Sequence, residues 1–330
     1  MKPMIAPMLW LTLFLFTLLA ATPGCGRRGD KSAASSDKIT IKLAENPWTG
    51  SSINVNVAKI LLDKLGYKVE LVTLDENAQW AALATGDLSA SLEIWPSGHQ
   101  EAIEQYIDNK KVVVNIGELG VVGKIGWYVP AYVVEQHAEL ATVEGFKDPA
   151  RAALFKTAET GEKGRFLTGD PSWVQYDGDI IKNLGLNLQV VSAGSEQAVL
   201  AAVDSAYSRK EPVLFYFWTP HAIHAKYKLT EVKLPAHSKA CYAKIKEGGV
   251  DCDYPPDRMF KVAFAGLEKQ APDAYTVLKR MRYSTDEQVA MIAAVELDKK
   301  SPRDVAEDWL DRNQATWNAW MPVAAEQATR

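Results

Sequence analysis

The chain has 330 residues and a formal net charge of −4 at pH 7. Its lysines and arginines form no basic cluster beyond short pairs, which argues against nucleic acid and anionic membrane surfaces as partners. Without an apolar N-terminal segment and the polar stretch after it, about 290 residues remain, which is enough for two domains of ordinary size.

The N-terminal segment has the features of an export signal. Its apolar core, Met8–Ala21, is typical of a secretory signal and is short for a permanent membrane span. Thr22–Cys25 follows and looks like a bacterial lipobox, with threonine where leucine is usual. We therefore expect a signal peptide over 1–24, lipidation at Cys25 and a flexible polar tether over 25–37. Ordinary cleavage and release is the alternative.

Strand and helix patterns alternate after this tether. Ser51 or Ser52 is expected to cap the first helix, and Gly66 and Gly86 are expected to end the first two helices. Strands separated by helices imply right-handed βαβ units around a parallel sheet. The predicted strands are 38–44, 69–72, 88–95 and 213–218, and the predicted helices are 53–65, 77–85 and 195–209.

The C-terminal part reads as helical. Ser284–Glu287 and Ser301–Asp304 are both capping-box openings, the second with proline at the first helical position. Trp309, Trp317 and Trp320 fall roughly on one face of the last predicted helix. These three tryptophans are therefore predicted to be core residues.

Two cysteines remain apart from Cys25, at positions 241 and 252. In an oxidising exported compartment, Cys241 and Cys252 are expected to form a disulfide, and two buried free thiols are the alternative. By chain-entropy arguments the bond would contribute roughly 2–3 kcal/mol to stability. The spacing is not Cys-x-x-Cys, so redox catalysis is not indicated.

Signatures of common enzymes are missing from the sequence. There is no Gly-rich phosphate loop, no Gly-x-Ser-x-Gly elbow and no His-Glu-x-x-His. Among five histidines only His221 and His224 fall close together, and no carboxylate or cysteine accompanies them at metal-ligand spacing. We predict a protein that is not an enzyme and has no cofactor and no metal.

Tryptophan is the informative residue, with ten in the chain. Trp80 lies among small and apolar residues of a predicted helix and is expected in the core. Trp95, Trp173 and Trp218 instead lie at strand ends or in loops bounded by proline and glycine, where ligands bind in open α/β sheets. Three indoles meeting there would form a cage for a cation that cannot donate a hydrogen bond. Separate packing of the three rings is the alternative.

Several segments, taken in order, carry a family resemblance. They are Gly126–Pro130, Asp148–Phe155, Leu167–Trp173, Pro212–Pro220 and the ending from Trp309 to Trp320. With them the chain resembles the periplasmic glycine betaine/proline betaine-binding proteins of ABC uptake systems over nearly all of its mature length. The resemblance implies an α/β fold of two lobes with a ligand cleft between them, as in class II periplasmic binding proteins. The implied division is 38–121 plus 257–330 for lobe I and 122–256 for lobe II.

The resemblance also implies a ligand site. Three tryptophans box the ammonium group in that family, at positions matching Trp95, Trp173 and Trp218. His99 stands where a histidine binds the ligand carboxylate, and the backbone N–H groups of Val174 and Gln175 match two further carboxylate donors. This sequence departs from some members around the second tryptophan, where their cysteine pair and glycine are replaced.

Five more residues are weaker candidates for the ligand site: Glu93, Trp48, Trp127, Tyr128 and His221. In a strand Glu93 points to the same face as Trp95, so it either adds negative charge near the cation or pairs with a neighbouring group. His221 follows Trp218 at a turn, where the resemblance implies a carboxylate contact and a structural role is the alternative. The other three lie near predicted strand ends.

The function implied is capture of a quaternary ammonium solute, glycine betaine or proline betaine, for an ABC permease and its ATPase. The protein is expected to be a monomer, exported to the periplasm or cell surface and held to the membrane by its N-terminal lipid. A receptor for choline, carnitine or a sulfonium compound is the alternative within the fold. A surface-anchored hydrolase of ammonium esters and a sensory or adhesive lipoprotein are more distant alternatives.

Overall fold

The computed structural model describes residues 38–323. The predicted signal peptide, the lipidation site at Cys25 and the tether therefore lie outside the described residues. Within residues 38–323, no helix is both long enough and apolar enough to cross a membrane.

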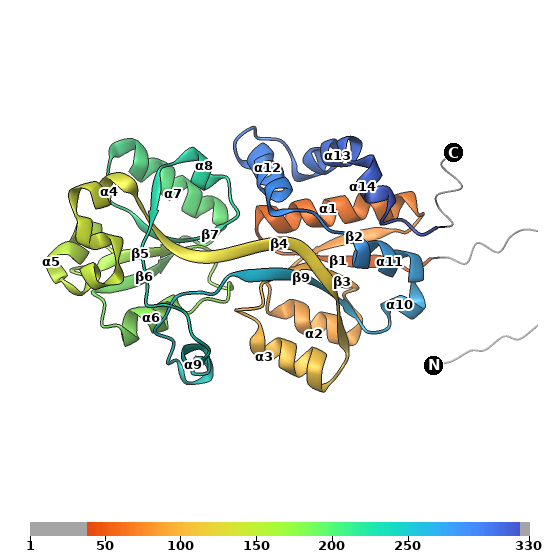
Figure 1. Ribbon diagram of the computed structural model, residues 1–330, viewed down its shortest axis with the longest axis horizontal. Coiled ribbons are helices and arrows are strands. Elements are labelled where there is room, and N and C mark those ends of the chain that lie inside the picture. The colour runs from red at the N-terminus through yellow and green to blue at the C-terminus, as the bar shows by residue number, and fades with distance from the viewer. Residues whose placement is uncertain (1–37, 324–330) are drawn as a thin grey trace, which may run out of the picture. The chain divides into compact units, whose positions relative to one another are not determined.

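The strands form one mixed sheet of nine members (Figure 1). They are β1 (Ile41–Glu45), β2 (Val69–Thr73), β3 (Ala90–Ile94), β4 (Val113–Pro130), β5 (Gly164–Thr168), β6 (Leu188–Ser192), β7 (Leu214–Thr219), β8 (Leu229–Glu231) and β9 (Asp257–Phe264). Their order in space is β2-β1-β3-β9-β4-β7-β5-β6, with β8 paired to β4. The four strands predicted from the sequence match β1, β2, β3 and β7 to within a few residues.

Helices connect these strands and also form the C-terminal part of the described chain, after β9. They are α1 (Thr49–Lys64), α2 (Ala78–Thr85), α3 (Gln100–Ala102), α4 (Ala131–Gln136), α5 (Pro149–Ala152), α6 (Asp177–Asn183), α7 (Glu196–Arg209), α8 (Ile223–Lys226), α9 (Lys239–Tyr242), α10 (Leu267–Gln270), α11 (Pro272–Arg280), α12 (Thr285–Glu296), α13 (Pro302–Arg312) and α14 (Gln314–Asn318). A π-helix (Ile103–Asn109) continues α3, and 3₁₀ turns span Ala138–Ala141, Val143–Lys147, Ala153–Phe155 and Ile245–Glu247.

The prediction of a parallel sheet is right for one set of strands and wrong for another. β1 pairs in parallel with β2 and β3, and β5 pairs in parallel with β6 and β7. β4 and β9 run antiparallel to each other, and each is also antiparallel to a neighbouring strand. Helical crossovers produce the parallel pairs, whereas β4 and β9 pair across more than a hundred positions of sequence.

The long strand β4 runs through both lobes of the structure (Figure 1). Its first part, up to Gly123, pairs with β9, and from Lys124 it pairs with β7. One lobe contains β1, β2, β3 and β9, and the other contains β5, β6, β7 and β8. The chain therefore crosses between the lobes on β4 and returns toward the first lobe on β9.

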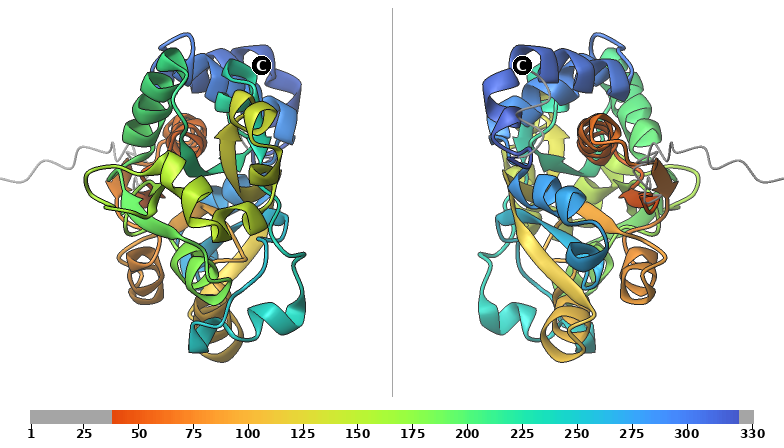
Figure 2. Two further views of the ribbon diagram at one scale, coloured as in Figure 1. Left: turned by 90° about the vertical axis from the view of Figure 1, so that its left-hand side faces the viewer. Right: turned by 90° about the vertical axis from the view of Figure 1, so that its right-hand side faces the viewer.

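Each lobe has its own apolar interior, with helices on both sides of the sheet (Figures 1 and 2). In the first lobe α1, α11, α12 and α13 cover one face, and their buried residues form a cluster that includes Ile53 and Leu278. On the other face α2 buries Trp80 and Leu83. The second lobe has one cluster, which includes Phe166. The indole of Trp80 is thus buried, as predicted.

The first helix begins earlier than its sequence predicts. α1 starts at Thr49, with Trp48 in the extended N-cap position, whereas Ser51 or Ser52 was expected to cap it. The Ser51 hydroxyl instead accepts a hydrogen bond from the Asn46 N–H over 3.0 Å. Ser51 therefore shapes the turn between β1 and α1, which brings Trp48 to the carboxyl end of β1.

The C-terminal helices follow the predicted capping signals. Ser284 and Glu287 form the full capping box at the start of α12, and the Ser301 hydroxyl accepts from the Asp304 N–H at the start of α13. The single last helix that was expected is broken after Arg312 into α13 and α14. The indoles of Trp309 and Trp320 stack across this break, with ring centroids 5.6 Å apart.

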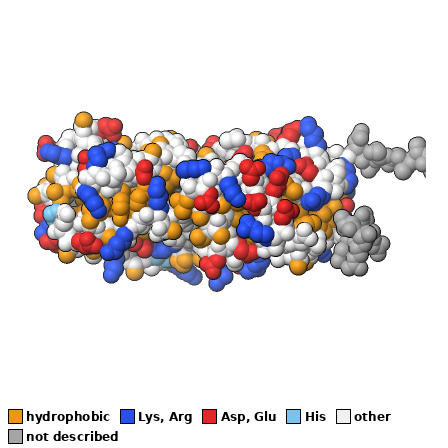
Figure 3. Space-filling view, turned by 90° about the horizontal axis from the view of Figure 1, so that it is seen from above, with side chains coloured by type: hydrophobic (Ala, Val, Ile, Leu, Met, Phe, Trp, Pro, Cys, Tyr) orange, Lys and Arg blue, Asp and Glu red, His pale blue; other side chains and the backbone are white. Residues whose placement is uncertain are grey.

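The surface carries both signs of charge. On the face shown in Figure 3, Lys and Arg side chains are interspersed with Asp and Glu side chains over both lobes. This arrangement agrees with the small net charge of the sequence.

Candidate functional site

The three tryptophans singled out in the sequence surround one cavity between the lobes. The cavity has a volume of about 430 Å³, counting the space open to solvent. Its lining residues are Trp48, Glu76, Trp95, Gly98, Ile125, Trp173, Val174, Tyr216 and Trp218. The first lobe provides Trp48 after β1 and Trp95 after β3, and the second provides Trp173 after β5 and Trp218 on β7.

The aromatic rings of the second lobe form a corner. The indoles of Trp173 and Trp218 meet edge to face, with centroids 5.2 Å apart and planes at 87°. Tyr216, two residues before Trp218 on β7, places its ring 5.9 Å from Trp173 and 6.1 Å from Trp218. All three rings are buried. Their electron-rich faces suit a desolvated cation.

Two glycines leave the room that these indoles occupy. A Cβ atom added at Gly123 on β4 would collide with the ring of Trp95, and one added at Gly169 would collide with the ring of Trp173. Neither glycine has a positive φ. Close approach of an indole to the backbone, and not an unusual conformation, is therefore what requires glycine at both positions.

Glu93 accepts hydrogen bonds from two of the four indoles that line the cavity. The indole N–H groups of Trp48 and Trp95 donate to Glu93 Oε1 over 2.7 and 3.1 Å. The side-chain amides of Asn54 and Gln288 donate to Oε2 over 2.6 and 3.4 Å. Burial raises the pKa of Glu93 to about 7, and the hydrogen bonds from the indoles oppose that rise. Glu93 does not line the cavity, so it positions the rings and does not face a ligand directly.

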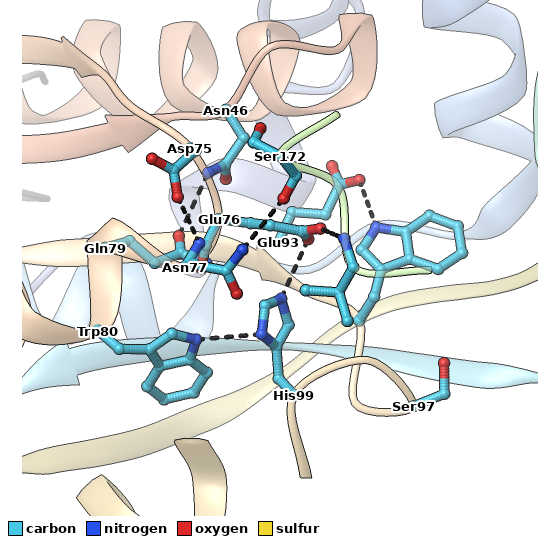
Figure 4. A network of polar contacts seen from close by, with 12 residues as sticks. Asn46, Asp75, Glu76, Asn77, Gln79, Trp80, Glu93, Ser97, His99 and Ser172 are labelled. Carbon is cyan, nitrogen blue, oxygen red and sulfur yellow. Dashed lines mark hydrogen bonds and ion pairs between the residues drawn. The ribbon is translucent and has the colours of Figure 1, made fainter. Parts of the chain in front are cut away.

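His99 is bonded to another side chain of the site. The Trp80 indole N–H lies 3.2 Å from His99 Nδ1, and Nε2 lies 3.0 Å from Glu76 Oε2 (Figure 4). An indole can only donate, so Nδ1 accepts and the ring proton sits on Nε2. His99 is therefore a neutral donor to Glu76, in the place where the resemblance implied a donor to a ligand carboxylate.

The loop after β5 supplies the second donor to the same carboxylate. The backbone N–H of Val174 donates to Glu76 Oε1. Gln175 contributes differently, because its side-chain oxygen accepts from the Thr168 hydroxyl over 2.5 Å. Among the described residues the Gln175 N–H makes no backbone–backbone hydrogen bond. Two of the three predicted carboxylate donors are thus engaged by Glu76.

His221 does not line the cavity. Its Nδ1 accepts from the Ile223 N–H over 3.1 Å, so its Nε2–H donates to Glu196 Oε1 over 3.0 Å. The ring also packs edge-on against Trp218, with centroids 5.6 Å apart. In place of the predicted ligand contact, His221 bonds to Glu196 and packs against the side of Trp218, and so supports that indole.

A buried polar contact joins the lobes beside His221. Glu196 Oε2 accepts from the backbone N–H of Thr49 over 2.9 Å, which links the start of α7 to the start of α1. Gln197 donates to Glu296 Oε1 over 3.0 Å, which links α7 to the end of α12. The oxygen and nitrogen atoms of Glu196, His221 and Glu296 lie within 4.8 Å of one another. His221 and Thr49 donate to Glu196, and Gln197 donates to Glu296, so these contacts join the two lobes at this rim.

Two other candidates lie inside the second lobe. Trp127 is fully buried, packs 4.4 Å from the Phe166 ring centroid and donates its indole N–H to Asp177 over 2.6 Å. Tyr128 packs against His224, with centroids 4.8 Å apart. The prediction that they line the cleft is wrong: the two rings point to opposite faces of β4, and both pack within the second lobe away from the cavity.

Sequence reasoning missed two lining residues that matter for the chemistry. Tyr216 could have been found, because residues 216 and 218 point to the same face of a strand. Glu76 lies just before α2 and reads as an acidic residue near a helix start. Its position after β2, at the carboxyl edge of the parallel strands, was the available signal.

The two cysteines of the second lobe are joined. Cys241 and Cys252 form a disulfide that spans 11 positions of sequence. Both residues are buried, and neither lines the cavity. The bond closes a loop that begins in α9 and contains the 3₁₀ turn Ile245–Glu247.

Comparison with known proteins places these features in a family. The model of the substrate-binding domain of ABC-type glycine betaine transport systems matches residues 39–312. A trimethylamine N-oxide-binding protein of Pelagibacter ubique is 29% identical over 297 residues, covering 87% of this chain and 92% of that protein. The glycine betaine/proline betaine-binding periplasmic protein of Salmonella typhimurium is 23% identical over 303 residues, covering 87% and 90%. The crystal structure of a choline-binding protein in complex with choline superposes with a TM-score of 0.69 at 20% identity, covering 88% of this chain and 97% of that one.

Proposed function

The chain belongs to the family of substrate-binding domains of ABC-type glycine betaine transport systems, and from this premise we propose that it captures a small methylated ammonium compound in the indole cage. Members of the family are substrate-binding components of transporters and not enzymes. The lobes share the architecture of two-lobed periplasmic binding proteins. The ligand itself is the part that we propose.

One observation carries the proposal, namely the meeting of four indoles and one phenol ring around a single cavity. A methylated ammonium nitrogen cannot donate hydrogen bonds, so water solvates it mainly through its charge. Aromatic faces replace that solvation, and each desolvated contact contributes about 2 kcal/mol. Five such contacts contribute on the order of 10 kcal/mol, which exceeds the lower estimates of about 4 kcal/mol for the freedom lost on binding.

Glycine betaine is the ligand predicted from the sequence, and it remains one candidate. Its trimethylammonium group fits the cage, and its carboxylate would need the N–H groups of His99, Val174 and Gln175. The relatives are named for trimethylamine N-oxide, for glycine betaine and proline betaine, and for choline. All these compounds share a methylated or alkylated nitrogen and differ in the oxygen-bearing group beside it.

Closure of the lobes is the proposed signal to the permease. We propose the lobe boundaries 38–121 plus 257–330 and 122–256, supported by the change of partners along β4. The cage draws two indoles from each lobe, so a ligand that touches all four favours the closed form. We further propose export, anchoring through Cys25 and a monomer that docks on an ABC permease with its ATPase.

Replacement of one indole tests the cage. Trp173→Ala should weaken binding of tetramethylammonium and of the preferred ligand by at least about 2 kcal/mol, or roughly 30-fold. The affinities would be measured by isothermal titration calorimetry. Trp317→Ala is the matched control, because Trp317 lies on α14 and its indole N–H donates to Leu310 O. Equal affinities in the wild type and Trp173→Ala would refute the cage.

A further inference from the structure

We propose that Glu76 makes this site selective for methylated ammonium cations that carry no carboxylate, of which choline is a representative. The inference rests on the proposed cage and names the class of ligand that the cage accepts. Glu76 is a specificity-determining residue in this proposal, and its carboxylate lines the cavity beside the indoles.

The donors that would bind a ligand carboxylate are already engaged by Glu76. Glu76 Oε2 accepts from His99 Nε2 over 3.0 Å, and Glu76 Oε1 accepts from the Val174 N–H. These are two of the donors that a carboxylate ligand would need. A carboxylate of the protein therefore stands in the place of a carboxylate from the ligand.

The contacts of Glu76 indicate its charge. Both oxygens of Glu76 face N–H donors, and His99 presents its proton because Nδ1 already accepts from Trp80. This arrangement suits an ionised carboxylate, which only accepts. Within residues 38–323, no Lys or Arg nitrogen lies within 4.0 Å of the Glu76 carboxylate, and Glu76 is 7% exposed. The positive charge that compensates a buried carboxylate here is the one that the ligand brings.

Hydrogen bonds of the neighbouring residues Asp75 and Asn77 fix the turn that carries Glu76 (Figure 4). On its N-terminal side Asp75 Oδ1 accepts from the N–H groups of Asn77 and Ala78, which fixes the turn into α2. On its C-terminal side the Asn77 amide donates to Ser172 O over 3.0 Å, which ties this turn to the loop of the other lobe. To admit a ligand carboxylate, Glu76 would have to leave both donors or take up a proton.

The selectivity follows from these contacts. A carboxylate beside Glu76 brings two like charges together in a buried site and leaves too few donors for both. The hydroxyl of choline can instead donate to Glu76. Trimethylamine N-oxide carries no net charge, and its oxygen is an acceptor that an ionised Glu76 cannot satisfy, so it should bind less tightly than choline.

The experiment compares four ligands on the whole mature protein. Tetramethylammonium, choline, trimethylamine N-oxide and glycine betaine are titrated by calorimetry into the wild type, Glu76→Gln and Glu104→Gln. Glu104 is exposed on the π-helix after His99 and controls for loss of one charge from the same lobe. Wild type should bind choline at least tenfold more tightly than glycine betaine, and more tightly than trimethylamine N-oxide. Glu76→Gln should raise the affinity for glycine betaine relative to choline at least tenfold, and Glu104→Gln should leave that ratio unchanged.

A second measurement needs no variant. Glycine betaine that enters the wild type with Glu76 still bonded to His99 and Val174 requires Glu76 to take up a proton, so its binding heat should depend on the ionisation heat of the buffer, and that of choline should not. Wild type that prefers glycine betaine without proton uptake, or a ratio unmoved by Glu76→Gln, overturns the role of Glu76 and leaves the cage intact. Failure of tetramethylammonium to bind counts against the cage itself.

Discussion

The buried carboxylate of Glu93 should make binding of a permanent cation depend on pH. Glu93 accepts the indole N–H groups of Trp48 and Trp95, and burial raises its pKa from 4.5 to about 7. The perturbation is Glu93→Gln, which keeps one oxygen for the two indoles. Its new amide would face Asn54 and Gln288, and the Gln288 side-chain oxygen has no partner among the described residues and can accept from it.

The sign of the effect on stability follows from the raised pKa. The folded ligand-free protein binds the Glu93 proton more tightly than the unfolded chain, so this contribution to stability is complete below about pH 4.5 and is lost as pH rises through about 7. The difference corresponds to about 3 kcal/mol. Glu93→Gln should remove this part of the pH dependence of the unfolding free energy.

Ligand binding should show the opposite trend. A cation in the cage favours the ionised form of Glu93, so affinity should rise between pH 5.5 and 8.5 as the carboxyl group loses its proton. Unit charges about 8 Å apart, separated by an indole, interact by about 2 kcal/mol at an effective dielectric constant near 20. The affinity should therefore increase by roughly 10- to 30-fold over this range.

Tetramethylammonium is the ligand for this assay, because it has no titratable group, and tryptophan fluorescence reports its binding. Asp257 also titrates nearby, since burial raises its pKa to about 6 while it accepts from Ser97. The slope of affinity against pH, compared between the wild type and Glu93→Gln, separates the contribution of Glu93 from that of Asp257. Identical slopes in both proteins would show that the charge of Glu93 does not reach the cage.

Three further predictions concern the supports of the site. Gly169→Ala should displace the Trp173 ring and weaken cation binding at least tenfold, as measured by calorimetry, because the added methyl group collides with the indole. Glu196→Gln should weaken the contact with Thr49 across the lobes and lower ligand affinity three- to tenfold, with a larger ligand-induced change in radius of gyration by small-angle scattering. Cys252→Ser, which opens the disulfide, should lower the unfolding free energy by about 2–3 kcal/mol in chemical denaturation and leave ligand affinity unchanged.

The indole cage could be predicted from sequence because its signals are local. Trp95, Trp173 and Trp218 each stand at or just past a strand end, and parallel strands bring their carboxyl ends to one edge. The same logic placed Trp48, which lines the cavity. Proximity to a strand end failed for Trp127, because its ring points from β4 into the interior of the second lobe, where it packs against Phe166.

The partners of the carboxylates could not be predicted, because they lie far away in sequence. Glu76 is 23 residues from His99 and 98 residues from Val174. Strand alternation put Glu93 on the ligand side with Trp95, but β3 ends at Ile94. Beyond that point alternation no longer fixes the side-chain direction, and the Trp95 indole turns its N–H back onto Glu93.

The charge balance of the cavity therefore rests on two acids in different roles. Glu93 stands behind the rings and Glu76 beside them, and within residues 38–323 neither has a Lys or Arg nitrogen within 4.0 Å. Two buried acids next to an aromatic cage favour a ligand with net positive charge over a zwitterion. Because Glu93 is shielded by the rings and Glu76 is not, loss of Glu93 should weaken all cations alike, whereas loss of Glu76 should change which of them is preferred.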